Sequence, residues 1–225
     1  MTAPETARDR IIADLPPKRI IIFDMGQVFV TFTPQTHNPE LLGNCRGTQE
    51  DLIRFFHGEP WAKYECGLIT NNQIYEQAVS ELGYRLDYQE FERDMCRTFE
   101  LDKNMFEFLN DLKMHTARTQ LQFWMLSNIN DIHHRHVAER WPGLFSSFLH
   151  VFLSYEMGCR KPDREIFERM LNVGQARPEE CIFVDDMETN GEGAKAVGMH
   201  FIKFESLPQL RRDLAKFGPL FEIPA

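Results

Sequence analysis

Polar residues follow apolar stretches at four widely separated places in this 225-residue chain. The groups are Asp24, the pair Ser127 and Asn128, Lys161, and the pair Asp185 and Asp186. If the apolar stretches are strands of one parallel sheet, their carboxyl ends lie on a single edge, where open α/β sheets bind ligands. We therefore expect these side chains to converge.

The residue types at this edge indicate a particular chemistry. Clustered carboxylates repel one another unless a cation holds them, and acids that offer only oxygen ligands suit Mg2+. Lys161 and the Ser127 hydroxyl can neutralise and hydrogen-bond phosphate oxygens, while Asp24 can attack phosphorus to form an aspartyl-phosphate. Taken alone, Asp24 could equally be a helix cap, because Asp favours that position.

The strands that must position these groups are visible as short apolar runs. The stretch from Arg19 to Val30 begins with three Ile and one Phe, which is typical of a strand buried on both faces. Gly26 then permits a tight turn. Strand character returns at Leu121–Leu126, Phe148–Leu153, Cys181–Val184 and Met199–Ile202. Helical stretches separate these runs, so we expect an α/β fold with a parallel sheet and right-handed crossovers.

A helical insert interrupts this alternation. Apolar residues recur with helical spacing in Gln49–Phe56, Gln73–Leu82, Tyr88–Thr98 and Lys103–His115, and we find no strand candidate between residues 35 and 116. The expected organisation is an N-terminal leader over 1–17, an α/β core formed by 18–34 and 117–225, and an all-helical insert over 35–116.

Composition restricts the class of partner. The formal charge of −9 argues against nucleic acid or an anionic membrane. No apolar run approaches the roughly 20 residues needed to span a bilayer. The five cysteines are isolated from one another, with no C-x-x-C, so we expect free thiols in a reducing cytoplasm. The sequence carries no signal for oligomeric state.

Four motifs in order resemble those of the haloacid dehalogenase-like superfamily. IIIFDMGQV resembles motif one with Asp24 as its nucleophile, and WMLSN resembles motif two with Ser127 as its phosphate-binding hydroxyl. The lysine of GCRKPD, Lys161, matches motif three. In FVDDMETN, Asp186 matches the metal-binding acid of motif four. The resemblance covers residues 20–204.

The resemblance implies a Rossmann-like core, an aspartyl-phosphate mechanism and a helical cap formed by the insert. It also implies that Asp24, Asp186 and the backbone carbonyl of Gly26 bind Mg2+. Asp185 and Asn190 would then support this site from behind, and Asn128 would join Ser127 and Lys161 in binding a small phosphorylated metabolite. The motif details are closest to a sugar-phosphate branch whose substrates include α-glucose 1-phosphate.

Gly26 departs from the pattern of most phosphatases in this superfamily. Those proteins carry a second Asp at this position, which serves as general acid and then as general base. Such assistance contributes roughly 100- to 10,000-fold to the rate. We therefore expect a preference for easily expelled leaving groups, such as an anomeric oxygen. Two alternatives remain open: a C–halogen hydrolase that uses the same aspartate without Mg2+, and a catalytically weak binding or regulatory protein.

Three histidines, His133, His134 and His136, follow motif two at near-helical spacing. A solvated helix face is the simpler interpretation. A metal site is the alternative, but no acid or cysteine completes one at ligand spacing.

Overall fold

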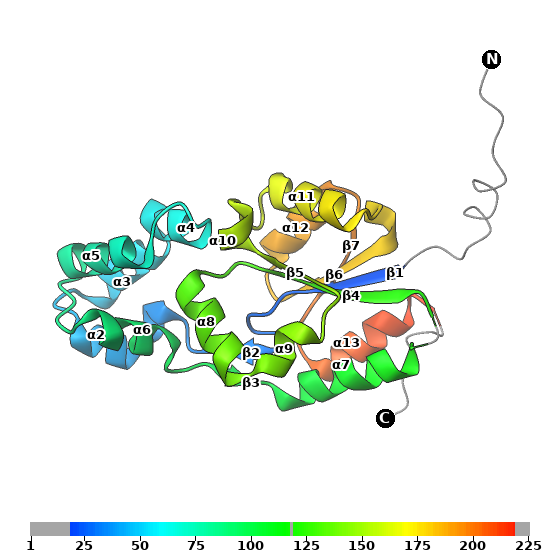
Figure 1. The fold of residues 1–225 in the computed structure, drawn as a ribbon, viewed down its shortest axis with the longest axis horizontal. Helices are drawn as coiled ribbons and strands as arrows, with labels where there is room; N and C mark the ends of the chain where they lie inside the picture. The colour runs from blue at the N-terminus through cyan, green and yellow to red at the C-terminus, as the bar shows by residue number, and fades with distance from the viewer. Residues whose placement is uncertain (1–18, 118, 219–225) are drawn as a thin grey trace, which may run out of the picture.

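A five-stranded parallel sheet forms the centre of the protein (Figure 1). The computed structural model describes residues 19–117 and 119–218, so the expected leader over 1–17 lies outside the described residues. The strand order is β5-β4-β1-β6-β7. The strands are β1 (Arg19–Phe23), β4 (Leu121–Ser127), β5 (His150–Leu153), β6 (Cys181–Asp185) and β7 (His200–Lys203). The predicted α/β class with a parallel sheet is confirmed.

Successive side chains of each strand point to opposite faces of the sheet, and helices cover both faces. Ile21 and Phe23 of β1 pack on the side of α7 (Lys103–His115), α9 (Pro142–Ser146) and α13 (Leu207–Ala215). Ile20 and Ile22 pack on the side of α11 (Arg164–Gly174) and α12 (Glu188–Ala196). The four apolar side chains of β1 are fully buried, as the unbroken apolar run predicts.

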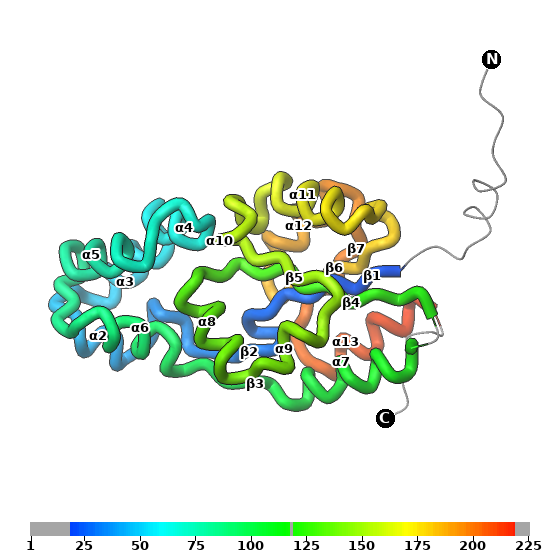
Figure 2. The backbone as a smooth tube through the Cα atoms, in the orientation of Figure 1, coloured from blue at the N-terminus to red at the C-terminus, as the bar shows by residue number. Residues whose placement is uncertain are grey.

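A second group of helices lies beyond the carboxyl edge of the sheet (Figure 2). It consists of α2 (Pro39–Asn44), α3 (Gln49–Phe56), α4 (Glu59–Glu65), α5 (Asn71–Glu81) and α6 (Tyr88–Cys96), with the short 3-10 helix Gln35–His37 before them. Their buried residues form a separate apolar cluster, which Ile132 of α8 (Asp131–Arg140) joins from the core. This group is the helical cap, and it stands over the edge at which the strands end.

A two-stranded ribbon connects the cap to the core. β2 (Val30–Thr31) pairs antiparallel with β3 (Glu100–Leu101), so that Val30 lies opposite Leu101. Asp102 N donates to Phe29 O at 2.8 Å just beyond the ribbon. Strand β3 shows that the prediction of no strand between residues 35 and 116 was wrong. Its two residues are too few to show the alternation of apolar and polar side chains by which a strand is recognised in a sequence. The segment that leads into the cap and the segment that leads out of it therefore lie side by side.

Helix α7 packs with the sheet rather than with the cap. Met105, Phe108, Leu109 and Leu112 belong to the same apolar cluster as Phe23. The insert expected over 35–116 included this helix. We propose that the cap ends before β3 and that α7 belongs to the core. No helix in the described part of the chain is long and apolar enough to cross a membrane.

Candidate active site

Asp24 lies at the carboxyl end of the central strand. Its backbone N donates to Val184 O of β6 at 2.8 Å, which continues the sheet by one residue. Its side chain turns to Lys161, with Oδ1 2.9 Å from Nζ, and the same oxygen accepts a hydrogen bond from Met25 N at 2.7 Å. Only 8% of Asp24 is exposed. One carboxylate oxygen, Oδ1, is thus held in place by the backbone of Met25 and by Lys161.

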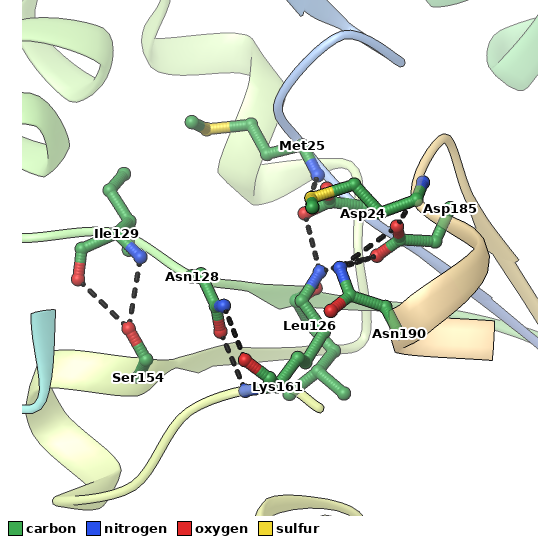
Figure 3. A network of polar contacts seen from close by, with 10 residues as sticks. Asp24, Met25, Leu126, Asn128, Ile129, Ser154, Lys161, Asp185 and Asn190 are labelled. Carbon is green, nitrogen blue, oxygen red and sulfur yellow. Dashed lines mark hydrogen bonds and ion pairs between the residues drawn. The ribbon is translucent and has the colours of Figure 1, made fainter. Parts of the chain in front are cut away.

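Lys161 is fully buried among oxygen atoms. Its Nζ lies 2.7 Å from Asp185 Oδ2 and donates to Leu126 O at 3.0 Å, in addition to its contact with Asp24 (Figure 3). Burial acts to lower the pKa of Lys161, but attraction to Asp24 and Asp185 outweighs it and raises the pKa above its usual value. The lysine therefore remains a cation at the centre of the site.

Asp185 is held from several sides at the end of β6. Asn190 of α12 donates through Nδ2 to both carboxylate oxygens at 3.0 Å, and Met187 N donates to Oδ1 at 2.8 Å. With Lys161 on Oδ2, both oxygens have partners. We infer that Asp185 and Asn190 position the lysine, in keeping with the supporting role expected for them.

Asn128 clamps the loop that carries the lysine. Its Nδ2 donates to Lys161 O at 2.9 Å, and its Oδ1 accepts from Lys161 N at 2.8 Å. These two bonds occupy both ends of the amide, so the contacts favour a positioning role over the expected contact with substrate. Ser127, the last residue of β4, is buried on the same edge of the sheet.

The turn after Asp24 is tightly folded around Gly26. Phe29 N and Val30 N both donate to Met25 O, and Gly26 forms an isolated bridge with Val30. A Cβ at position 26 would lie 3.3 Å from Phe32 Cε1. The ring of Phe32 would therefore have to shift by a few tenths of an ångström to admit a side chain at position 26. The spacing of apolar residues gave no signal for this contact.

Three carboxylates form the one group of potential metal ligands found among the described residues. Ligand atoms of Asp24, Asp185 and Asp186 lie within 4.8 Å of one another. Burial raises the pKa of Asp24 to about 7 against the opposing effect of Lys161, and burial followed by repulsion from Asp185 raises that of Asp186. One ammonium faces three acids, so a divalent cation suits the cluster, and hard oxygen ligands suit Mg2+.

Ser154 was not foreseen as part of this edge. It follows β5 at the start of α10 (Ser154–Met157) and is fully buried. Its Oγ accepts from Ile129 N at 2.9 Å and lies 2.6 Å from the backbone oxygen of Glu65 in the cap. Its position at a strand end was the only available signal. The serine ties the loop after Ser127 to helix α4.

The sequence is similar to proteins that are named as enzymes. The chain is 32% identical over 184 residues to the sesquiterpene phosphatase astK of Aspergillus oryzae, covering 79% of this chain and 85% of that protein. It is 26% identical over 211 residues to the drimenol cyclase drtB of Aspergillus calidoustus. That match covers 89% of this chain, which spans only 37% of the cyclase.

Solved structures share the fold. The HAD family enzyme BT-2542 of Bacteroides thetaiotaomicron, solved in complex with magnesium and inorganic phosphate, superposes with a TM-score of 0.71 at 22% identity. The alignment covers 85% of this chain and 98% of that one. The model of the haloacid dehalogenase-like hydrolase family matches residues 53–198, well over half of the sequence. With the four motifs gathered at one sheet edge beneath a helical cap, this match shows that the chain belongs to the haloacid dehalogenase-like hydrolases.

Proposed function

We propose that this hydrolase is a Mg2+-dependent phosphatase that hydrolyses a small phosphomonoester through an aspartyl-phosphate on Asp24. The observation that carries the proposal is the contact of 2.9 Å between Asp24 Oδ1 and Lys161 Nζ within the cluster of three carboxylates. A buried ammonium beside a nucleophilic carboxylate lets a phosphate dianion approach it. We take the cytoplasm as the location, in keeping with five free cysteines.

Asp24 would act through the oxygen that Met25 N and Lys161 leave free. That oxygen attacks phosphorus, the P–O bond to the leaving group breaks, and water then hydrolyses the acyl phosphate to release inorganic phosphate and restore Asp24. Ser127 would hold a phosphate oxygen, and the charge of Lys161, whose Nζ already contacts Asp24, Asp185 and Leu126 O, would offset that of the phosphate. Asp24, Asp186 and the Gly26 carbonyl would hold Mg2+, which when bound neutralises phosphate charge and orients the group in line.

A sugar phosphate is the substrate class that we propose. The motif resemblance implies it, and Gly26 supports it because no acid at that position can protonate the departing oxygen. An anomeric oxygen leaves more readily than a primary alkoxide. We therefore expect sugar 1-phosphates to be hydrolysed faster than the matching 6-phosphates.

A terpenyl monophosphate is a second candidate. The observation in its favour is the match to the sesquiterpene phosphatase, at 32% identity over most of both chains. The aromatic ring of Phe32 beside Gly26 would also suit an apolar leaving group.

A substrate panel with and without Mg2+ tests these proposals. It contains glucose 1-phosphate, glucose 6-phosphate, farnesyl monophosphate and a 2-haloacid, with Asp24→Asn as the inactive control. Phosphate release that needs both Mg2+ and Asp24 supports the proposed function. The ratio of the rates on the sugar phosphates and on farnesyl monophosphate then shows which substrate class the enzyme prefers. Halide release without metal would instead indicate a dehalogenase. No turnover of any compound would favour the binding-protein alternative.

A further inference from the structure

Ser154 lies buried where the cap meets the loop after β4. Its Oγ accepts a hydrogen bond from Ile129 N at 2.9 Å and lies 3.0 Å from Ile129 O (Figure 3). The same Oγ lies 2.6 Å from the backbone oxygen of Glu65, the last residue of cap helix α4. Ser154 is fully buried, so bulk water does not compete for these bonds. One hydroxyl group thus contacts the cap and a core loop together.

This hydroxyl has one proton to donate and two carbonyl oxygens within reach. Glu65 O is the nearer acceptor, so the cap takes the proton when α4 is seated. Donation to the cap fixes the direction of the hydroxyl and turns a lone pair toward Ile129 N. If α4 moves away, the proton can turn to Ile129 O, and the cap no longer fixes the hydroxyl. The orientation of Ser154 therefore depends on the cap.

Ile129 lies in the loop that carries the expected phosphate-binding groups. Ser127 precedes it by two residues, and Asn128 clamps the backbone of Lys161 with hydrogen bonds of 2.9 and 2.8 Å. Asn130, the next residue, caps α8. A shift of the Ile129 peptide therefore moves the backbone that carries both Ser127 and Asn128.

Further contacts hold the end of α4 against the core around this serine. Glu65 Oε2 lies 3.1 Å from Arg160 Nη1. A Cβ added at Gly67 would collide with the backbone oxygen of Tyr155, the residue after Ser154. The backbones of cap and core are therefore in close contact next to the serine, and a change in their separation alters the contacts of its hydroxyl.

We propose that Ser154 is a positioning residue that links the seating of the cap to the phosphate-binding loop, so that cap contact and phosphate affinity depend on each other. This inference rests on the proposed phosphatase function. Ser154 touches no reacting group; it acts through Ile129 on Ser127. Coupling between two binding events is reciprocal, so a bound phosphate should in turn hold the cap in place.

Two variants act on opposite sides of this link. Ser154→Ala removes the hydroxyl and leaves Ile129 N without its acceptor, whereas Gly67→Ala pushes α4 away from the core and leaves the serine intact. With p-nitrophenyl phosphate as substrate and Mg2+ present, we expect each to raise the inhibition constant of inorganic phosphate and the KM about tenfold, with kcat within about threefold of wild type. The double variant should be no worse than either single one, because both break the same link.

Arg135→Met is the matched control. It breaks the ion pair between Arg135 of α8 and Glu92 of cap helix α6, away from the serine. Its effect on the inhibition constant should multiply with that of Ser154→Ala. Ser154→Thr keeps a hydroxyl and should retain most of the phosphate affinity. Thermal unfolding of each variant shows whether it is folded.

Hydrogen exchange provides a measurement that does not depend on turnover. Saturating inorganic phosphate with Mg2+ should slow amide exchange in residues 59–68 of the wild-type cap. We expect this protection to be lost in Ser154→Ala compared at equal saturation, since the hydroxyl that joins the loop to α4 is gone.

Multiplying effects of Ser154→Ala and Gly67→Ala would overturn the link and assign the serine a purely structural role. An unchanged inhibition constant in either single variant would overturn it as well, and Gly67→Ala decides the matter even where Ser154→Ala does not fold. A wild-type enzyme that uses Asp24 and binds phosphate but shows either result contradicts this inference alone. A wild-type protein that neither binds phosphate nor hydrolyses any phosphomonoester contradicts the proposed function.

Discussion

Lys161 and Asp185 form an ion pair of 2.7 Å in which both side chains are fully buried. The lysine comes from the loop after α10 and the aspartate from the end of β6, so the pair joins two crossovers of the sheet. Asn190 and Met187 N saturate the carboxylate from behind. Asp24, the proposed nucleophile, thus faces a cation whose position is set by Asp185, Asn190 and the backbone of Met187.

Removing the charge of Asp185 should therefore reduce both stability and activity. Breaking one side of a buried ion pair typically costs about 3–5 kcal/mol because the remaining charge is left unpaired. We expect Asp185→Asn to lower the unfolding free energy by an amount of this order and to lower kcat, as measured by urea unfolding and phosphate release.

The neighbouring acid provides the control for that experiment. Asp186 is half-buried, and its pKa is raised by burial and by Asp185, so its charge does not stabilise the apo protein. We expect Asp186→Asn to unfold at the same urea concentration as wild type or a higher one, while losing Mg2+-dependent activity. Equal destabilisation by both variants would contradict the different roles assigned to the two acids.

Mg2+ should stabilise the folded protein. At 100 times its dissociation constant, a ligand that binds only the native state adds about 2.7 kcal/mol, which for a chain of this size corresponds to roughly 5–10 °C in Tm. We expect this shift in wild type, its loss in Asp24→Asn and Asp186→Asn, and complete inactivation by EDTA. Differential scanning fluorimetry with Ca2+ and K+ as comparison ions provides the measurement.

An aspartate at position 26, where most phosphatases of this superfamily carry a general acid, should raise the rate of hydrolysis only if Phe32 is also changed. The Cβ of Gly26→Asp would lie 3.3 Å from the Phe32 ring, a tighter contact than usual, so we expect the ring to hinder the carboxyl from turning toward the leaving group. We expect Gly26→Asp alone to gain nothing on glucose 6-phosphate. Combined with Phe32→Ala, it should exceed Phe32→Ala alone by up to about 100-fold. A gain from the single variant would show that Phe32 does not restrict this position.

His133 should make stability depend on pH. It is buried against Phe99 and Asn130, and burial, with a smaller effect from His136, lowers its pKa to about 3. The unfolded chain takes up a proton near pH 6.5 and the folded chain does not, so stability falls as pH drops below that value. The loss is about 2 kcal/mol between pH 6.5 and pH 5. His133→Gln should flatten this part of the curve in urea titrations.

Much of the architecture was predictable from local pattern. Helices α3 and α7 begin and end at the predicted residues, since amphipathic spacing and the Thr48 capping box define α3 and Asp102 caps α7. The apolar runs ending at Asp24 and Asp185 form buried strands because no polar residue interrupts them, and the two strands pair in parallel. Convergence of Asp24, Lys161 and Asp185 then followed from the topology of a parallel sheet.

Contacts between distant residues could not be predicted in the same way. Helical spacing does not say which cluster a helix joins, so α7 was grouped with the insert although it packs on the sheet. His133 was expected on a solvated face, yet the cap buries it. Phe32 approaches Gly26 because of the geometry of a loop, and Glu65 pairs with Arg160 because the cap packs on the core. A short window of sequence contains information on neither arrangement.

The β2–β3 ribbon has a consequence for how such proteins diversify. Because Val30 lies opposite Leu101, the intervening segment can be exchanged, lengthened or trimmed while the two ends that receive it stay one strand spacing apart. Selection can thus replace the helical cap without disturbing the acids and the lysine beneath it. Grafting the 32–99 segment of one such hydrolase onto another is the laboratory counterpart of that exchange.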